Sequence, residues 1–121
     1  FYEHLERQIA QSRRDNSQFR IIRIILPDSM SELSLLDFAS ALNQSTRNED
    51  VISRIGRLEF VVLLRISQST PDKSKDIIGR ISDIYEGHFL FSTALINGGI
   101  DSMTALEQLD QALFKRSTNP N

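Results

Sequence analysis

Residues 47–64, RNEDVISRIGRLEFVVLL, decide the fold of this chain. They contain two runs rich in apolar and β-branched residues, Val51–Ile55 and the start of Glu59–Ile66. Gly56 and Arg57 lie between these runs. Two such runs on either side of a short glycine-containing turn predict a β-hairpin. The remaining elements can be placed relative to this hairpin.

A helix, a strand and a second helix are expected before the hairpin. Phe1–Arg14 has apolar residues at a spacing of four, which is typical of one helical face, and Phe19–Leu26 is a short β-branched run typical of a buried strand. Ser29 and Glu32 form an S-x-x-E capping box, which predicts a helix from about Met30 to Ser45. The expected buried face of this helix comprises Leu35, Phe38, Ala39 and Leu42.

A helix, a strand and a last helix are expected after the hairpin. Thr70, Pro71 and Asp72 are typical of an N-cap, a first-turn proline and a first-turn acid, so a helix is expected to begin there and to end at Gly87. A strand at Phe89–Ile96 precedes a last helix. That helix is expected to be capped by Asp101 or Ser102, with a frayed tail at Thr118–Asn121. The expected inner residues of the two helices are Ile77, Ile81 and Ile84, and then Leu106, Leu109 and Leu113.

This order of elements predicts an α/β (α+β) domain with a central, mostly antiparallel sheet flanked by helices. The 121 residues suit one domain, 1–121, with a modest core. Because the chain begins without Met, we expect it to be a domain from a longer protein.

The composition argues against several classes of protein. A net charge of −2 argues against a protein held to DNA or RNA by bulk attraction to phosphates. The absence of cysteine excludes disulfides, thiolate metal sites and a cysteine nucleophile. Apolar runs are far shorter than the roughly 18 residues typical of a membrane span, so no span is expected in this segment.

Neither a metal site nor a nucleophilic triad is expected. His4 and His88 lie at opposite ends of the sequence, and no pair of residues has the spacing of metal ligands. No serine lies in a Gly-x-Ser-x-Gly turn. Acids such as Glu107 and Asp110 are typical of solvated helix faces.

Arg47 and Asp50 are the candidate binding residues. They lie where a helix is expected to give way to a strand, so their side chains can converge. An arginine fork can donate two hydrogen bonds to O6 and N7 of guanine, and a nearby carboxylate can accept from the other edge of the base. The alternative is a local ion pair at a helix end, which contributes little to stability.

Two stretches resemble known motifs. Residues 54–64, RIGRLEFVVLL, resemble the R-[YI]-G-G-[DE]-E-F-x-[VI]-[LI]-[LM] signature of GGDEF domains, the diguanylate cyclase family. Residues 101–114 resemble the final helix of that family, typically D-S-x-E-x-L-x-x-A-D-x-A-L-Y. The resemblance implies a nucleotidyl-cyclase-like fold and a role in bacterial second-messenger signalling.

The departures from the signature imply that cyclase activity is lost. Gly56, Glu59 and Phe60 match it, but Arg57 replaces the second glycine and Leu58 replaces the first acid. In the family this acid takes part in metal binding and catalysis, and leucine can do neither. The aspartates that end the family's first strand are also absent, and its guanine-binding segment has no counterpart here. We therefore expect no catalytic residue, no metal and no cofactor.

A second family site is retained. Many GGDEF domains bind their product, cyclic di-GMP, at an inhibitory R-x-x-D motif five residues before the glycine of the signature. Arg47 and Asp50 have this spacing from Gly56, and Arg80 matches a further family arginine if the loop of residues 67–75 is slightly longer than usual. The resemblance thus implies a cyclic di-GMP receptor in the bacterial cytoplasm, or in the cytoplasmic part of a membrane-bound or multidomain protein.

Two alternatives remain open at this point. The chain could be a scaffold that binds no nucleotide and contacts other domains of its parent, a protein partner or a second copy. Arg57 and Leu58, protruding at the hairpin turn, are then the expected contact residues. The chain could also be a residual enzyme with Glu59 as its sole acid.

Overall fold

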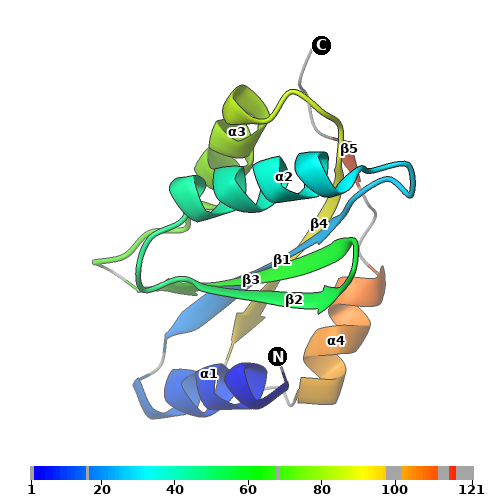
Figure 1. The fold of residues 1–121 in the computed structure, drawn as a ribbon. Coiled ribbons are helices and arrows are strands. Elements are labelled where there is room, and N and C mark those ends of the chain that lie inside the picture. The colour runs from blue at the N-terminus through cyan, green and yellow to red at the C-terminus, as the bar shows by residue number, and fades with distance from the viewer. Residues whose placement is uncertain (1, 16, 68, 98–101, 112–114, 117–121) are drawn as a thin grey trace.

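A computed structural model describes residues 2–15, 17–67, 69–97, 102–111 and 115–116. Its strands form a five-stranded sheet in the order β2-β3-β1-β4-β5, and every pairing is antiparallel (Figure 1). The strands are β1 (Gln18–Ile25), β2 (Val51–Gly56), β3 (Glu59–Ile66), β4 (Leu90–Asn97) and β5 (Lys115–Arg116). The helices are α1 (Tyr2–Asp15), α2 (Glu32–Ser45), α3 (Ser74–Ile84) and α4 (Ser102–Gln111).

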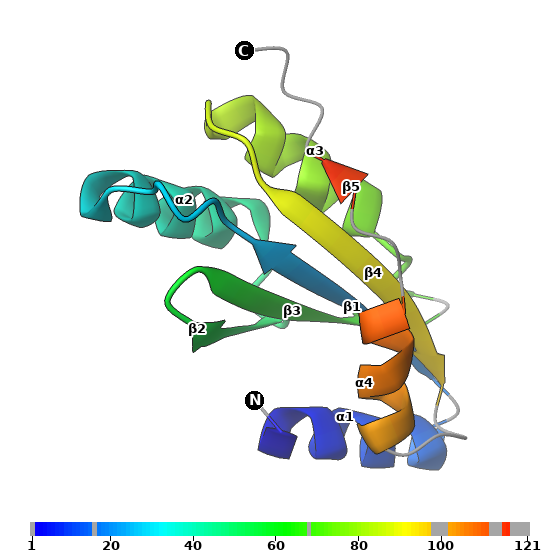
Figure 2. The same ribbon diagram turned by 90° about the vertical axis from the view of Figure 1, so that its right-hand side faces the viewer.

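Helices cover both faces of the sheet. Helices α2 and α3 lie over one face, and α1 and α4 lie over the other (Figures 1 and 2). The expected α+β class with an antiparallel sheet is confirmed, and the short strand β5 is an addition that the sequence did not predict. Among the described residues, no helix has the length and the apolar character that crossing a membrane requires.

Strand β1 is the centre of the fold. It pairs along its full length with β3 on one side and with β4 on the other. Because successive side chains of a strand point to opposite faces, Ile22 packs under α2 and α3, whereas Ile21 packs under α1 and α4. Both are fully buried, which explains the nearly continuous apolar run of this strand.

An aromatic cluster fills the layer between the sheet and the α2–α3 pair. The ring centroid of Phe38 lies 5.2 Å from that of Tyr85, 5.5 Å from that of Phe60 and 5.6 Å from that of Phe89. The Tyr85 and Phe89 rings meet Phe38 edge-on, a preferred geometry for aromatic pairs. Phe38 thus joins α2 to the end of α3 and to the sheet.

Two helices begin later than expected. Helix α2 begins at Glu32, and its N-cap is Ser31, whose Oγ accepts a hydrogen bond from the Ser34 N–H (3.1 Å). The capping box based on Ser29 is therefore wrong. Helix α3 begins at Ser74 rather than near Thr70, because the Asp72 carboxylate accepts a hydrogen bond from the Ser74 N–H (3.0 Å) and holds the preceding residues in a turn.

Two expected core positions are also wrong. Ala39 is only partly buried, and Ala41 faces the core in its place. Ile84 is 48% exposed because α3 ends there, and Ile78 packs inward instead. The cap of α4, Phe1, Leu113, the side chain of Leu106 and the tail at 118–121 lie outside the described residues.

Candidate functional site

The hairpin turn between β2 and β3 is fastened to the loop between β1 and α2. Arg57 Nη2 donates a hydrogen bond to the Met30 carbonyl oxygen (3.3 Å) and lies 3.5 Å from Glu32 Oε1. The Leu26 N–H donates to the Leu58 carbonyl oxygen (2.8 Å). These contacts join the turn to the segment that leads into α2.

Leu58 does not protrude as expected. Its side chain is partly buried and packs against the core beneath α2 and α3, as Met30 does. The hydroxyl of Tyr85 donates to the Met30 sulfur (3.1 Å), so the loop that Leu58 contacts is itself held in place. Arg57 is exposed, as expected, although its guanidinium is paired with Glu32.

Arg54 supports the turn from within β2. Its Nε donates to the Gly56 carbonyl oxygen (3.2 Å) and its Nη2 to the Arg57 carbonyl oxygen (2.7 Å). Its guanidinium carbon also lies 5.7 Å from the centroid of the Phe60 ring. A Cβ added at Gly56 would meet nothing closer than the Glu59 Cβ at 3.7 Å, so the turn does not need glycine for space.

Glu59, the acid for which the resemblance was noted, is bound by an arginine. Arg23 Nε donates to Glu59 Oε1 (2.6 Å), and Arg23 Nη1 donates to Asp110 Oδ1 (2.7 Å). Asp110 is thus an ion-pair partner across the α4 face rather than a merely solvated acid. No group of three or more His, Cys, Asp or Glu side chains within the described part of the chain is arranged to hold a metal ion. His88 is exposed, and the side chain of His4 is outside the description.

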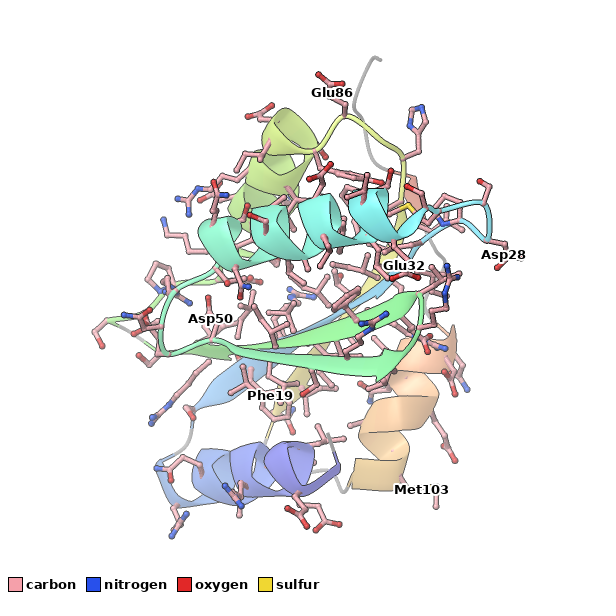
Figure 3. All side chains as sticks on the ribbon, in the orientation of Figure 1. Phe19, Asp28, Glu32, Asp50, Glu86 and Met103 are labelled. Carbon is pink, nitrogen blue, oxygen red and sulfur yellow. The ribbon has the colours of Figure 1, made fainter. Side chains whose placement is uncertain are left out.

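At the other end of the hairpin, Arg47 and Asp50 form a compact loop. The Asp50 N–H donates to the Arg47 carbonyl oxygen (3.1 Å), and the Arg47 N–H donates to Asp50 Oδ2 (2.8 Å). The guanidinium adds two contacts to the same carboxylate, Nη2 to Oδ1 at 3.2 Å and Nε to Oδ2 at 3.4 Å. The Asp50 side chain is completely buried, whereas that of Arg47 is 27% exposed. Figure 3 labels Asp50 at this end of the hairpin and Glu32 toward the other end.

Arg80 is not joined to this pair. It lies on the outer, exposed side of α3, opposite the residues that α3 buries. It forms no hydrogen bond or ion pair with any residue that the structure describes. Of the three expected ligand-binding residues, the structure brings two together and leaves the third apart, as a free cation on the neighbouring helix.

A hollow of about 400 Å³ beside the Arg47–Asp50 loop was not expected from the sequence. It is lined by Glu49 and by the end of β3 with the loop that follows, namely Leu63, Arg65, Ser67, Ser69 and Thr70. Residues 67–75 were expected to form a loop, with Thr70 as the cap of the next helix, and no pattern within them predicts a hollow.

Together, the order of the strands and the helices on both faces match the nucleotidyl-cyclase-like fold of GGDEF domains. No protein-family model matches the sequence, and no curated protein matches it significantly. Solved structures do match. Because their sequences are less than 25% identical to this chain, these matches establish the expected fold alone.

The first of these structures is the diguanylate cyclase SiaD from Pseudomonas aeruginosa in complex with its activator SiaC. It has a TM-score of 0.76 at 16% identity, over 92% of this chain and 50% of the SiaD chain. The present chain therefore spans half the length of that protein.

The present chain spans a larger share of two further solved structures. A sensory box/GGDEF family protein from Caulobacter crescentus has a TM-score of 0.71 at 17% identity, over 93% of this chain and 86% of that chain. The GGDEF domain of DgcB from Caulobacter crescentus, in complex with cyclic di-GMP, has a TM-score of 0.69 at 11% identity, over 89% and 77%.

Proposed function

We propose that this chain is a catalytically inactive GGDEF domain that acts as a cyclic di-GMP receptor through Arg47, Asp50 and Arg80. The observation that carries the proposal is the Arg47–Asp50 loop. The buried carboxylate of Asp50 holds both the backbone and the guanidinium of Arg47, while part of the Arg47 side chain stays exposed. The backbone of the R-x-x-D turn is thereby ordered before any ligand arrives, which lowers the entropy cost of binding even though the Arg47 side chain must turn.

The proposed mode of binding follows from the chemistry of these groups. The Arg47 fork matches O6 and N7 of guanine, and its plane can stack on a base. Since Asp50 is buried in the free protein, its carboxylate reaches the Watson–Crick edge only after Arg47 has turned toward the ligand. Arg80, exposed on α3, is available for the second guanine or a phosphate.

The absence of cyclase activity is part of the same proposal. Leu58 offers no ligand to a hard cation and is packed against the core. Arg57 places a charged side chain at the turn and is hydrogen-bonded to Met30, and Arg23 neutralises Glu59, the acid that matches the signature. The missing acid, the arginine at the turn and the pairing of Glu59 support inactivity independently of one another.

The decisive experiment is isothermal titration with cyclic di-GMP. Wild-type protein should show saturable binding, which Arg47→Ala and Asp50→Ala should abolish. Arg47→Lys should also bind much more weakly, because lysine keeps the charge but lacks the planar fork. Arg14→Ala is the matched control, since Arg14 is an exposed arginine of α1, on the opposite face of the sheet from α3.

A second candidate function is a protein-binding scaffold, which the exposed leucines of α2 favour. Leu33 and Leu36 are 76% and 65% exposed on its outer face. If folded wild-type protein gives no heat with cyclic di-GMP, the receptor proposal is wrong and the scaffold function takes its place.

The thermal unfolding midpoint of each site variant must be measured alongside the titrations. Asp50 is buried, so a loss of binding in Asp50→Ala counts only if the variant is folded.

A further inference from the structure

A groove of about 480 Å³ runs between α2 and the end of α3, apart from the hairpin turn and from the Arg47–Asp50 loop. Its walls are formed by one face of α2 and by the chain that leaves α3. The lining residues used below are Asp37, Ala41, Ile84, Tyr85 and Glu86. Figure 3 labels Glu86 just beyond the end of α3.

The groove is negatively charged. Asp37 and Glu86 both line it and are exposed, and neither makes a hydrogen bond or ion pair within the described residues. No lysine or arginine is among its lining residues. The negative end of the α3 dipole lies here as well, and α3 has no basic residue in its last turn. Such a potential favours a cation and disfavours a phosphate.

The walls of the groove are partly apolar. The exposed Ile84 and the buried Ala41 both line it. The Tyr85 ring is held rigidly by its edge-on contact with Phe38 at 5.2 Å and by the hydrogen bond from its hydroxyl to the Met30 sulfur. Burial, and then the nearby Asp37 carboxylate, raise the pKa of Tyr85 above its ordinary value of 10.0.

We propose that this groove binds an arginine side chain presented by a protein partner. The guanidinium lies between the carboxylates of Asp37 and Glu86, and its aliphatic stem covers Ile84. A planar cation on an apolar stem matches a rigid groove with two separate carboxylates. A metal ion does not match it, because the groove lacks a third acidic or histidine ligand among the described residues. The inference does not depend on nucleotide binding.

The test uses two peptides and the ¹⁵N-labelled protein. The first peptide carries arginine beside leucine, and the second carries glutamine in place of each arginine. The arginine peptide should give saturable shifts in the amide signals of residues 34–44 and 84–87, and the glutamine peptide should give none. Asp37→Asn and Glu86→Gln should each weaken binding about tenfold, as expected for the loss of a charge-assisted contact.

Glu107→Gln is the matched control, because Glu107 is an exposed acid on α4, on the opposite face of the sheet. Its affinity for the arginine peptide should equal that of the wild type. Equal shifts on α4 and at the groove would overturn the proposal by showing general attraction to an acidic surface. Unchanged affinity in both Asp37→Asn and Glu86→Gln, or equal binding of the glutamine peptide, would overturn it as well.

Discussion

Arg23 of β1 holds the carboxylate of Glu59 at 2.6 Å, so this acid at the start of β3 already has a cation beside it. The same guanidinium reaches Asp110 of α4 at 2.7 Å. A fixed positive charge at this position opposes the approach of a divalent metal ion to Glu59. The ion pairs also tie the hairpin and the last helix to the central strand.

We therefore expect no conversion of GTP to cyclic di-GMP, with either magnesium or manganese. Restoring the signature in an Arg57→Gly, Leu58→Asp double variant should not produce activity, because Glu59 stays paired with Arg23 and β1 ends without an aspartate. Chromatography of the nucleotides after incubation measures this. Product formed by the wild type would contradict our inference of inactivity.

Asp50→Asn should destabilise the fold by about 1–3 kcal/mol, because it removes the charge that compensates Arg47 and leaves a buried amide with poorer partners. Chemical denaturation of the two proteins measures the difference. Glu49→Gln provides the control. The Glu49 carboxylate is exposed and makes a long contact of 3.5 Å with Arg47 Nε, so the loss of its charge should cost little stability. Equal effects of the two changes would show that the buried pair does not organise the loop.

Gly87→Ala should destabilise the aromatic cluster. An added Cβ would lie 2.5 Å from the Tyr85 hydroxyl oxygen and 2.6 Å from the ring carbon that bears it, so the ring must move away from Phe38 and Met30. A loss of about 1–3 kcal/mol is typical of overpacking.

Gly79→Ala is the contrasting substitution. Nothing lies within 4 Å of a Cβ at this position of α3, and alanine should stabilise the helix by up to about 1 kcal/mol. Melting temperatures of the two variants should thus shift in opposite directions. A Gly87→Ala protein as stable as the wild type would show that Tyr85 is free to rearrange.

Asp72 should make stability depend on acid pH. Burial acts to raise its pKa, but hydrogen bonds from Ser74 and the two that Arg20 donates to Oδ2 outweigh this effect and lower it below its ordinary value of 3.8. A carboxyl whose pKa is lowered by folding stabilises the native state above the unfolded pKa, and this stabilisation is lost as the pH falls through the folded pKa. Because solvent screens this exposed pair, Asp72→Asn should cost less than about 1 kcal/mol near pH 7, and the cost should fall further near pH 2. A cost that does not change with pH would argue against this assignment.

The strands could be predicted almost completely, because their signals are local. The apolar run of β1 and the paired runs around Gly56 appear in the structure within a residue of the expected limits. The starts of α2 and α3 were misplaced because several residues compete for each cap. Ser29 and Ser31 both precede α2, and only the folded backbone directs the Ser31 hydroxyl toward Ser34.

The spatial arrangement of the site could be predicted only in part. The spacing alone indicated that Arg47 and Asp50 could meet, since only two residues separate them in a turn. The pairing of Glu59 with Arg23, the inward packing of Leu58 and the groove beside Asp37 arise between segments distant in sequence. No local pattern contains that information.

The place of β1 at the centre of the sheet also bears on how the chain is made. Its partner β3 is synthesised soon after the hairpin turn, but its other partner, β4, ends only at Asn97. Until then one edge of a strand with fully buried isoleucines has no neighbour and remains open to pairing with other chains. We expect that nascent chains halted before β4 aggregate, and that this pairing of distant segments limits the rate of folding.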